Sequence, residues 1–223
     1  MTDMLESDSA AINARLSRCL DAAKAETLPF RHWLLEDVLP LDAAHAIPAL
    51  PIAAPDIDDT QGRRETHNAT RSFFSVENQA RFPVAREMAA SFQSPETVHR
   101  LERVTGTTLR GASLRIEYCQ DTDGFWLEPH TDIGVKLFTM LVYLSDTPEA
   151  EKWGTDIYDR ELRHVGAAPG GFNRGLIFIP GTDTWHGVAR RKFDGVRKSI
   201  IINYVKPEWR ARHELAFPDQ PVA

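Results

Sequence analysis

The segment VRKSIIINYV, at residues 196–205, is one of six short runs rich in Ile, Val, Leu, Phe and Tyr that fill the second half of the chain. Clusters of turn-forming residues separate the runs, among them DTDG at 121–124. Short strands at this spacing, divided by turns, are typical of an antiparallel sandwich or barrel. The other five runs are SLRIEYC (113–119), KLFTMLVYLS (136–145), TDIYD (155–159), GLIFIP (175–180) and WHGVA (185–189).

The first half of the chain is predicted to be mainly helical. Apolar residues recur at helical spacing between 8 and 26. The segments 83–92 and 95–104 each begin with a proline, a residue that suits the first turn of a helix. A polar stretch at 57–72 is expected to be a long loop of the kind that borders a site.

The length of 223 residues suits one domain with one substantial core. We therefore expect a mainly β protein, with the helices packed outside one sheet. In this division, residues 1–106 supply helical support and loops, 107–206 form the β core and 207–223 form a C-terminal tail.

Composition argues against several classes of protein. The chain has 32 acidic and 26 basic side chains, a net charge of −6, and a nucleic-acid-binding protein usually carries a basic excess instead. No apolar run approaches the roughly 18 residues of a membrane span, and no secretory segment follows Met1. Two cysteines do not make a disulfide framework. We expect a cytoplasmic protein that binds neither nucleic acid nor membrane.

Three residues of the β half have the character of metal ligands. His130 and Asp132, in EPHTD, are two positions apart, so on a strand their side chains project from the same face. His186 lies in the later strand-like run, with strands between to return the chain to the same place. Two imidazoles and one carboxylate form a facial set that leaves three positions open on a non-haem Fe(II). The ligands alone do not choose the metal, because Zn²⁺ binds such sets more tightly.

A second pair of residues points to a bound carboxylate. Arg197 and Ser199 alternate onto one face of the strand 196–205, and a guanidinium beside a hydroxyl is a suitable carboxylate clamp. The joint occurrence of the clamp and the ligand set is much harder to obtain by accident than either one alone.

With these motifs the sequence resembles the Fe(II)/2-oxoglutarate-dependent oxygenase superfamily, over residues 107–206, and most of all its prolyl-4-hydroxylase-like branch. The matching residues are H-T-D at 130–132, His186 and R-K-S at 197–199. The resemblance implies a double-stranded β-helix, a jelly-roll or cupin-like barrel. It also implies Fe(II) as the metal, 2-oxoglutarate as cosubstrate and O2 as oxidant, with succinate and CO2 released.

The resemblance also implies further contacts. Tyrosines on two strands commonly hold the cosubstrate in this branch, and Tyr118 and Tyr143 are the corresponding candidates. Trp126, in the loop before His130, and Asn203, on the same strand face as Arg197, are weaker candidates for substrate contact. Nucleic-acid demethylases of the superfamily carry a second arginine where this chain has Asn203, which agrees with the acidic net charge.

The expected function is hydroxylation of a C–H bond in a small molecule or an amino-acid side chain, with no catalytic residue beyond the metal centre. Two alternatives remain. A cupin-like metal-dependent isomerase or hydrolase would not need Arg197, and a non-catalytic sensor would bind 2-oxoglutarate or metal without producing succinate.

Overall fold

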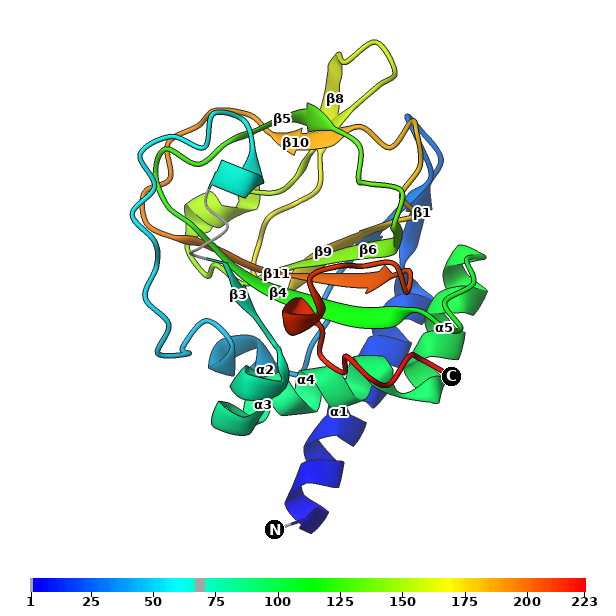
Figure 1. Cartoon of the computed structure of the whole chain (residues 1–223). Helices are drawn as coiled ribbons and strands as arrows, with labels where there is room; N and C mark the ends of the chain where they lie inside the picture. The colour runs from blue at the N-terminus through cyan, green and yellow to red at the C-terminus, as the bar shows by residue number, and fades with distance from the viewer. Residues whose placement is uncertain (1, 67–70) are drawn as a thin grey trace.

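A computed structural model describes residues 2–66 and 71–223 of the chain. Two antiparallel sheets face each other, and helices cover the outer face of the larger sheet (Figure 1). This is the mainly β architecture with an outer helical layer that the sequence predicts. Among the helices described, none combines the length and apolar character that a membrane crossing requires.

Over residues 2–66 and 71–223, the large sheet has seven strands and the small sheet has four. In spatial order, the large sheet contains β1 (Lys24–Glu26), β2 (His32–Leu35), β9 (Arg174–Phe178), β6 (Lys136–Tyr143), β11 (Arg197–Val205), β4 (Ser113–Asp121) and β3 (Ser72–Phe73). The small sheet contains β5 (Leu127–His130), β10 (His186–Val188), β7 (Asp156–Tyr158) and β8 (His164–Ala167). Strands β1 to β3 come from the first half of the chain, so the large sheet extends beyond residues 107–206.

Besides a 3-10 turn at 64–66, the described residues contain five α-helices and two short 3-10 helices. They are α1 (Thr2–Ala22), α2 (Leu41–Ala46), α3 (Val76–Arg81), α4 (Pro83–Gln93), α5 (Pro95–Thr105), η2 (Pro148–Lys152) and η3 (Arg212–Glu214). Helices α4 and α5 both begin at the prolines that the sequence marks as first-turn residues. Ser94 caps α5 by accepting the backbone N–H of Thr97 at 3.3 Å, which satisfies a group that the helix itself leaves unpaired.

Strand β11 lies at the centre of the large sheet and pairs along most of its length with β4 and β6. Alternation divides its side chains between two environments. Ile200, Ile202 and Tyr204 point toward the helices and are fully buried in the main core. The Tyr204 hydroxyl donates to the carbonyl of Phe92 in α4 at 2.5 Å, which ties the sheet to the helical layer. Arg197 and Ser199 therefore lie on the inner face, between the sheets.

The segment predicted as a long loop, 57–72, contains one 3-10 turn at 64–66 and ends in β3. Residues 67–70 of that prediction lie outside the described residues. The described part from 57 to 66, which we call the mouth segment, passes over one side of the space between the sheets (Figure 1).

Candidate metal centre and adjoining cavity

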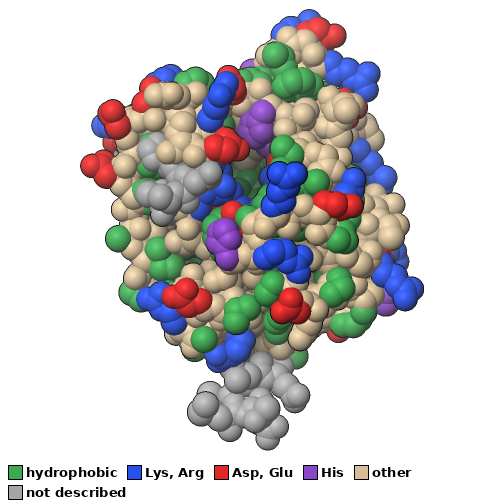
Figure 2. Space-filling model, in the orientation of Figure 1, with side chains coloured by type: hydrophobic (Ala, Val, Ile, Leu, Met, Phe, Trp, Pro, Cys, Tyr) green, Lys and Arg blue, Asp and Glu red, His purple; other side chains and the backbone are tan. Residues whose placement is uncertain are grey.

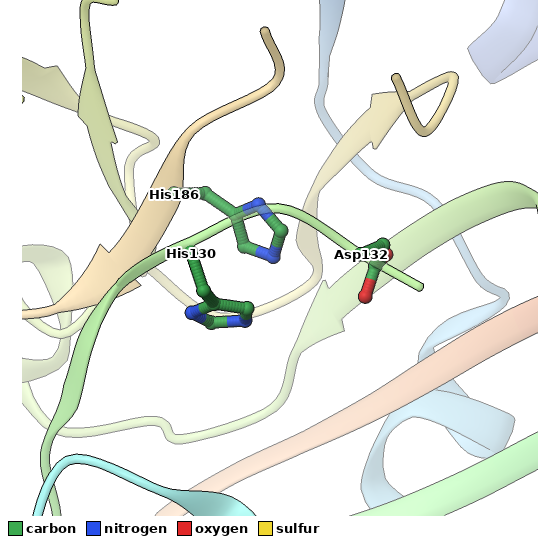
Figure 3. Close-up of side chains that lie close together, drawn as sticks. All are labelled: His130, Asp132 and His186. Carbon is green, nitrogen blue, oxygen red and sulfur yellow. The ribbon is translucent and has the colours of Figure 1, made fainter. Parts of the chain in front are cut away.

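The three predicted metal ligands meet at one place between the two sheets. His130 ends β5 and His186 begins β10, and the two residues pair directly across these antiparallel strands. Their ring centroids are 4.4 Å apart. Asp132 follows β5 by two residues, and one potential ligand atom from each of the three side chains lies within 4.8 Å of the others (Figure 3). The pairing of β5 with β10 thus brings His186 next to Asp132 and His130, which precede it by 54 and 56 positions in the sequence.

Backbone carbonyls orient both imidazoles. Nδ1 of His130 is 2.8 Å from the carbonyl of Glu128, and Nδ1 of His186 is 2.9 Å from the carbonyl of Thr184. A carbonyl oxygen only accepts, so each Nδ1 carries the proton and donates. In the neutral ring this leaves the lone pair on Nε2, which is the form that a metal ion requires.

Two neighbours hold the carboxylate of Asp132. Lys136 donates to Oδ1 at 2.5 Å and Thr139 donates to Oδ2 at 2.7 Å. Burial of this carboxyl would raise its pKa, but the charges of Lys136 and His186 and the two hydrogen bonds lower the pKa to about 2. Asp132 is therefore an anion at neutral pH, as a metal ligand must be.

The His186 ring is buried, and this burial lowers its pKa to about 4 in spite of the opposing charge of Asp132. The imidazole is neutral at physiological pH. Asp132 and His186 are therefore in the protonation state that coordinates a divalent ion without first releasing a proton.

A cavity of about 360 Å³ adjoins these ligands. It opens on the face shown in Figure 2, where the surface is hollowed near the centre and basic and acidic side chains surround the opening. The mouth segment contributes Arg63 and Arg64 to its wall, and the inner faces of β4 and β11 contribute Glu117 and Asn203.

Arg197 lines the same cavity and is only 2% exposed. Its Nε donates to the carbonyl of Trp153 at 2.5 Å and its Nη1 to Asp121 at 2.5 Å. Its Nη2 and the hydroxyl of Ser199 are buried without a hydrogen-bond partner among the described residues. Unpaired buried donors are costly, so two of them on one strand face fit a bound ligand that accepts hydrogen bonds.

Tyr143 lies on the inner face of β6, beside Arg197. The guanidinium carbon of Arg197 is 5.7 Å from the centre of the tyrosine ring. The hydroxyl donates to Thr155 Oγ1 at 2.8 Å and accepts from the Thr155 backbone N–H at 3.2 Å. Thr155, which the sequence did not mark as a site residue, lines the cavity.

Tyr118 is placed elsewhere. It pairs with Ile200 in the register of β4 and β11, and both side chains belong to the core beneath the large sheet. The inner positions of β4 are the odd-numbered ones, which include Glu117 and Cys119. Tyr118 is not among the residues that line the cavity, and its predicted cosubstrate contact stays a prediction.

The two weaker candidates for substrate contact differ in their position relative to the cavity. Asn203 lines the cavity and donates to Thr139 Oγ1 at 3.0 Å. Trp126 does not line the cavity. Its indole N–H donates to Asp59 at 2.6 Å, and its ring packs under Arg190. Trp126 therefore anchors the mouth segment to the small sheet.

The inner face of β4 carries three charged side chains that sequence reasoning missed. Arg115, Glu117 and Asp121 are each 2% exposed or less. Arg71, just before β3, makes two hydrogen bonds to Glu117, at 2.9 and 2.7 Å. The sequence does carry a signal for them: in RIEYCQD (115–121), every second residue except Cys119 is charged.

A scan of the sequence against protein-family models finds no match, and a search of curated protein sequences finds none either. Solved structures do match. A prolyl hydroxylase from Trichoplax adhaerens, in complex with a hypoxia inducible factor oxygen degradation domain peptide fragment, has 12% identity and a TM-score of 0.56, covering 95% of this chain and 96% of its own.

A Pseudomonas putida prolyl-4-hydroxylase has 12% identity and a TM-score of 0.54, covering 87% of this chain and 92% of its own. A structure of prolyl 4-hydroxylases from Phytophthora capsici has 14% identity and a TM-score of 0.57, covering 89% of this chain and 65% of its own. The chain thus shares the double-stranded β-helix fold of these prolyl hydroxylases, and the predicted fold is confirmed.

Proposed function

We propose that the protein is an Fe(II)- and 2-oxoglutarate-dependent dioxygenase that hydroxylates a C–H bond in a small molecule or an amino-acid side chain. One observation carries the proposal. The ligand set His130, Asp132 and His186 shares a cavity wall with Arg197, whose free Nη2 lies on the same strand face as the free hydroxyl of Ser199.

Each group has a role in this proposal. The three ligands bind Fe(II) and leave half of its coordination positions for other molecules. Arg197 and Ser199 bind the distal carboxylate of 2-oxoglutarate through charge-assisted hydrogen bonds. The metal and cosubstrate together supply an oxidant from O2, with succinate and CO2 as the other products.

The remaining walls select and place the substrate. Asn203 and Thr139 lie close to the ligand set, and the mouth segment borders the opening. Holding one C–H bond near the metal gives both rate and selectivity. A cavity of about 360 Å³ suits a cosubstrate together with a small molecule or one side chain of a peptide.

The two cysteines, Cys19 and Cys119, are free and buried. This usage is typical of a reducing compartment. It supports a cytoplasmic location as part of the proposal.

An anaerobic titration with Fe(II) and 2-oxoglutarate tests the function. We expect a weak visible charge-transfer band that forms only when both are present, and that is lost in His130→Ala. Absence of the band from wild-type protein shown to hold the metal would overturn the proposal. Turnover of a substrate by Arg197→Ala with no 2-oxoglutarate would favour an isomerase or hydrolase. Binding without succinate formation, across a substrate screen under air, would favour a sensor.

A further inference from the structure

Asp121 joins the predicted cosubstrate clamp to the mouth segment. Its Oδ2 accepts from Nη1 of Arg197 at 2.5 Å, and its Oδ1 accepts from Nη1 of Arg64 at 3.3 Å. Asp121 and Arg197 side chains are each 3% exposed, so this contact is shielded from water. One carboxylate is therefore shared by two arginines that lie 133 positions apart in the sequence.

The pairing leaves Arg197 only partly available to a ligand. Its Nε is bound to a backbone carbonyl, its Nη1 to Asp121, and Nη2 alone remains with the hydroxyl of Ser199. A ligand carboxylate would have to contact the same guanidinium that Asp121 already contacts. Two anions would then share one buried cation, and like charges in a poorly hydrated space repel strongly.

Arg64 supplies the second cation. Its side chain is 18% exposed, lines the cavity, and lies over the ring of Phe125 at 4.7 Å. Its contact with Asp121 makes a chain of alternating charge, Arg64–Asp121–Arg197, to which a ligand carboxylate adds a fourth member. Within this chain there are two cations for two anions with Arg64 in place, and one cation without it. Glu117, 3.8 Å from Arg64, is paired with Arg71 and Arg115.

We propose that Arg64 and Asp121 are positioning residues for the cosubstrate. Arg64 neutralises Asp121 and so permits Arg197 to bind the distal carboxylate of 2-oxoglutarate. This inference rests on the proposed function, because it concerns the same clamp. It makes cosubstrate affinity depend on the placement of the mouth segment, which also borders the substrate opening. By linkage, the bound cosubstrate stabilises that placement of Arg64 by the same free energy that the placement contributes to cosubstrate binding.

The test is a double-mutant cycle read by anaerobic calorimetry on the Fe(II)-loaded protein, with two ligands. One is 2-oxoglutarate, and the other is 2-oxopentanoate, which has the same chain length and metal-binding end but no distal carboxylate. We expect Arg64→Ala to raise the Kd for 2-oxoglutarate about tenfold, because an uncompensated carboxylate then faces the ligand. The Kd for 2-oxopentanoate should change less than about twofold.

The second background isolates Asp121. In Asp121→Asn protein the repelling charge is gone, so adding Arg64→Ala should change the Kd for 2-oxoglutarate by less than about twofold. Arg64→Lys, which keeps the cation, should restore most of the wild-type affinity. Arg81→Ala is the control, because Arg81 is an arginine on α3 that does not line the cavity and its side chain is 58% exposed. This control should leave the Kd for each of the two ligands unchanged.

The outcomes separate this inference from the function on which it rests. Wild-type protein that binds both ligands equally, or neither, would overturn the proposed clamp itself. If wild-type protein prefers 2-oxoglutarate, two results would overturn the role of Arg64 alone. One is an equal rise in the Kd for both ligands in Arg64→Ala. The other is an equal rise in the Kd for 2-oxoglutarate when Arg64→Ala is made in wild-type and in Asp121→Asn protein. Thermal unfolding of each variant checks that the loss is not one of folding.

Discussion

The ammonium of Lys136 lies 2.5 Å from Oδ1 of Asp132, the carboxylate that the ligand set presents to a metal. The lysine side chain is 19% exposed and the aspartate side chain 6%, so the contact is only partly screened. A divalent ion bound to Asp132 would face this positive charge and compete with it for the same oxygen.

Lys136→Met should therefore bind metal more tightly. We expect the Kd for Mn²⁺, used as a redox-inert probe, to fall about fivefold, because a neighbouring cation and a competing hydrogen bond are removed together. Calorimetry at pH 7 measures this directly. An unchanged or weaker affinity would show that Lys136 mainly orients the carboxylate.

Thr139→Val should have the opposite effect. Its hydroxyl donates to Oδ2 of Asp132 without adding charge, so its loss frees the carboxylate to rotate. Loss of such a supporting hydrogen bond typically weakens metal binding about tenfold or more. The same Mn²⁺ titration compares the two variants, and equal shifts in one direction would contradict the assigned roles.

Arg197→Gln should abolish the preference for a dicarboxylate. The substitution removes the buried cation and keeps a polar side chain, so we expect a rise of about a hundredfold in the Kd for 2-oxoglutarate. Mn²⁺ affinity should stay within about twofold of wild type, because Arg197 is not a metal ligand. A parallel loss of metal binding would indicate a general collapse of the cavity.

The metal-free protein should lose stability as the pH falls from 7 to 4. Burial lowers the pKa of His186 in the folded protein to about 4, from its ordinary value of 6.5. In that window the unfolded chain binds a proton that the folded chain does not, so the free energy of unfolding falls, by up to about 3 kcal/mol. Asp132, whose pKa is lowered from 3.8 to about 2, adds a loss that begins near the acid end of this range and falls mostly below it.

Urea unfolding at several pH values measures this slope. His186→Gln lacks this imidazole. Its total fall in the free energy of unfolding between pH 7 and pH 4 should be smaller by the contribution of His186, which is up to about 3 kcal/mol. Identical slopes in the two proteins would contradict the buried neutral state of His186.

Tyr204→Phe tests the link between the sheet and the helical layer. The substitution removes a buried hydrogen bond and leaves the Phe92 carbonyl without that donor. We expect a loss of about 1–2 kcal/mol in the free energy of unfolding. Mn²⁺ and 2-oxoglutarate binding should remain as in wild type, since Tyr204 lies on the opposite face of β11 from Arg197. Altered ligand binding would contradict that separation.

The sequence was sufficient for the features that depend on local pattern. The period-two spacing of Arg197 and Ser199 predicts that they share a face, and both lie on the inner face of β11. His130 and Asp132 also converge, although Asp132 lies two residues beyond the end of β5 and not on a strand. The prolines at the starts of α4 and α5 likewise mark helices that the structure contains.

Features that depend on register between distant strands were not accessible in this way. Tyr118 lies on the helix side because β4 pairs Tyr118 with Ile200, and nothing in RIEYC reveals that pairing. The partnership of Asp121 with Arg197 arises from the same register. The Asp59 contact of Trp126 spans 67 positions, so an aromatic residue near the site in sequence became a structural anchor.

The division of β11 has a consequence for how ligand binding can be observed. Its inner face carries Arg197 and Ser199, while its outer face carries Ile200, Ile202 and Tyr204 into the helix-side core. A ligand held by the inner face therefore restrains a strand whose amides bond to β4 and β6. Slower amide hydrogen exchange should spread across the central sheet, well beyond the residues that touch the ligand.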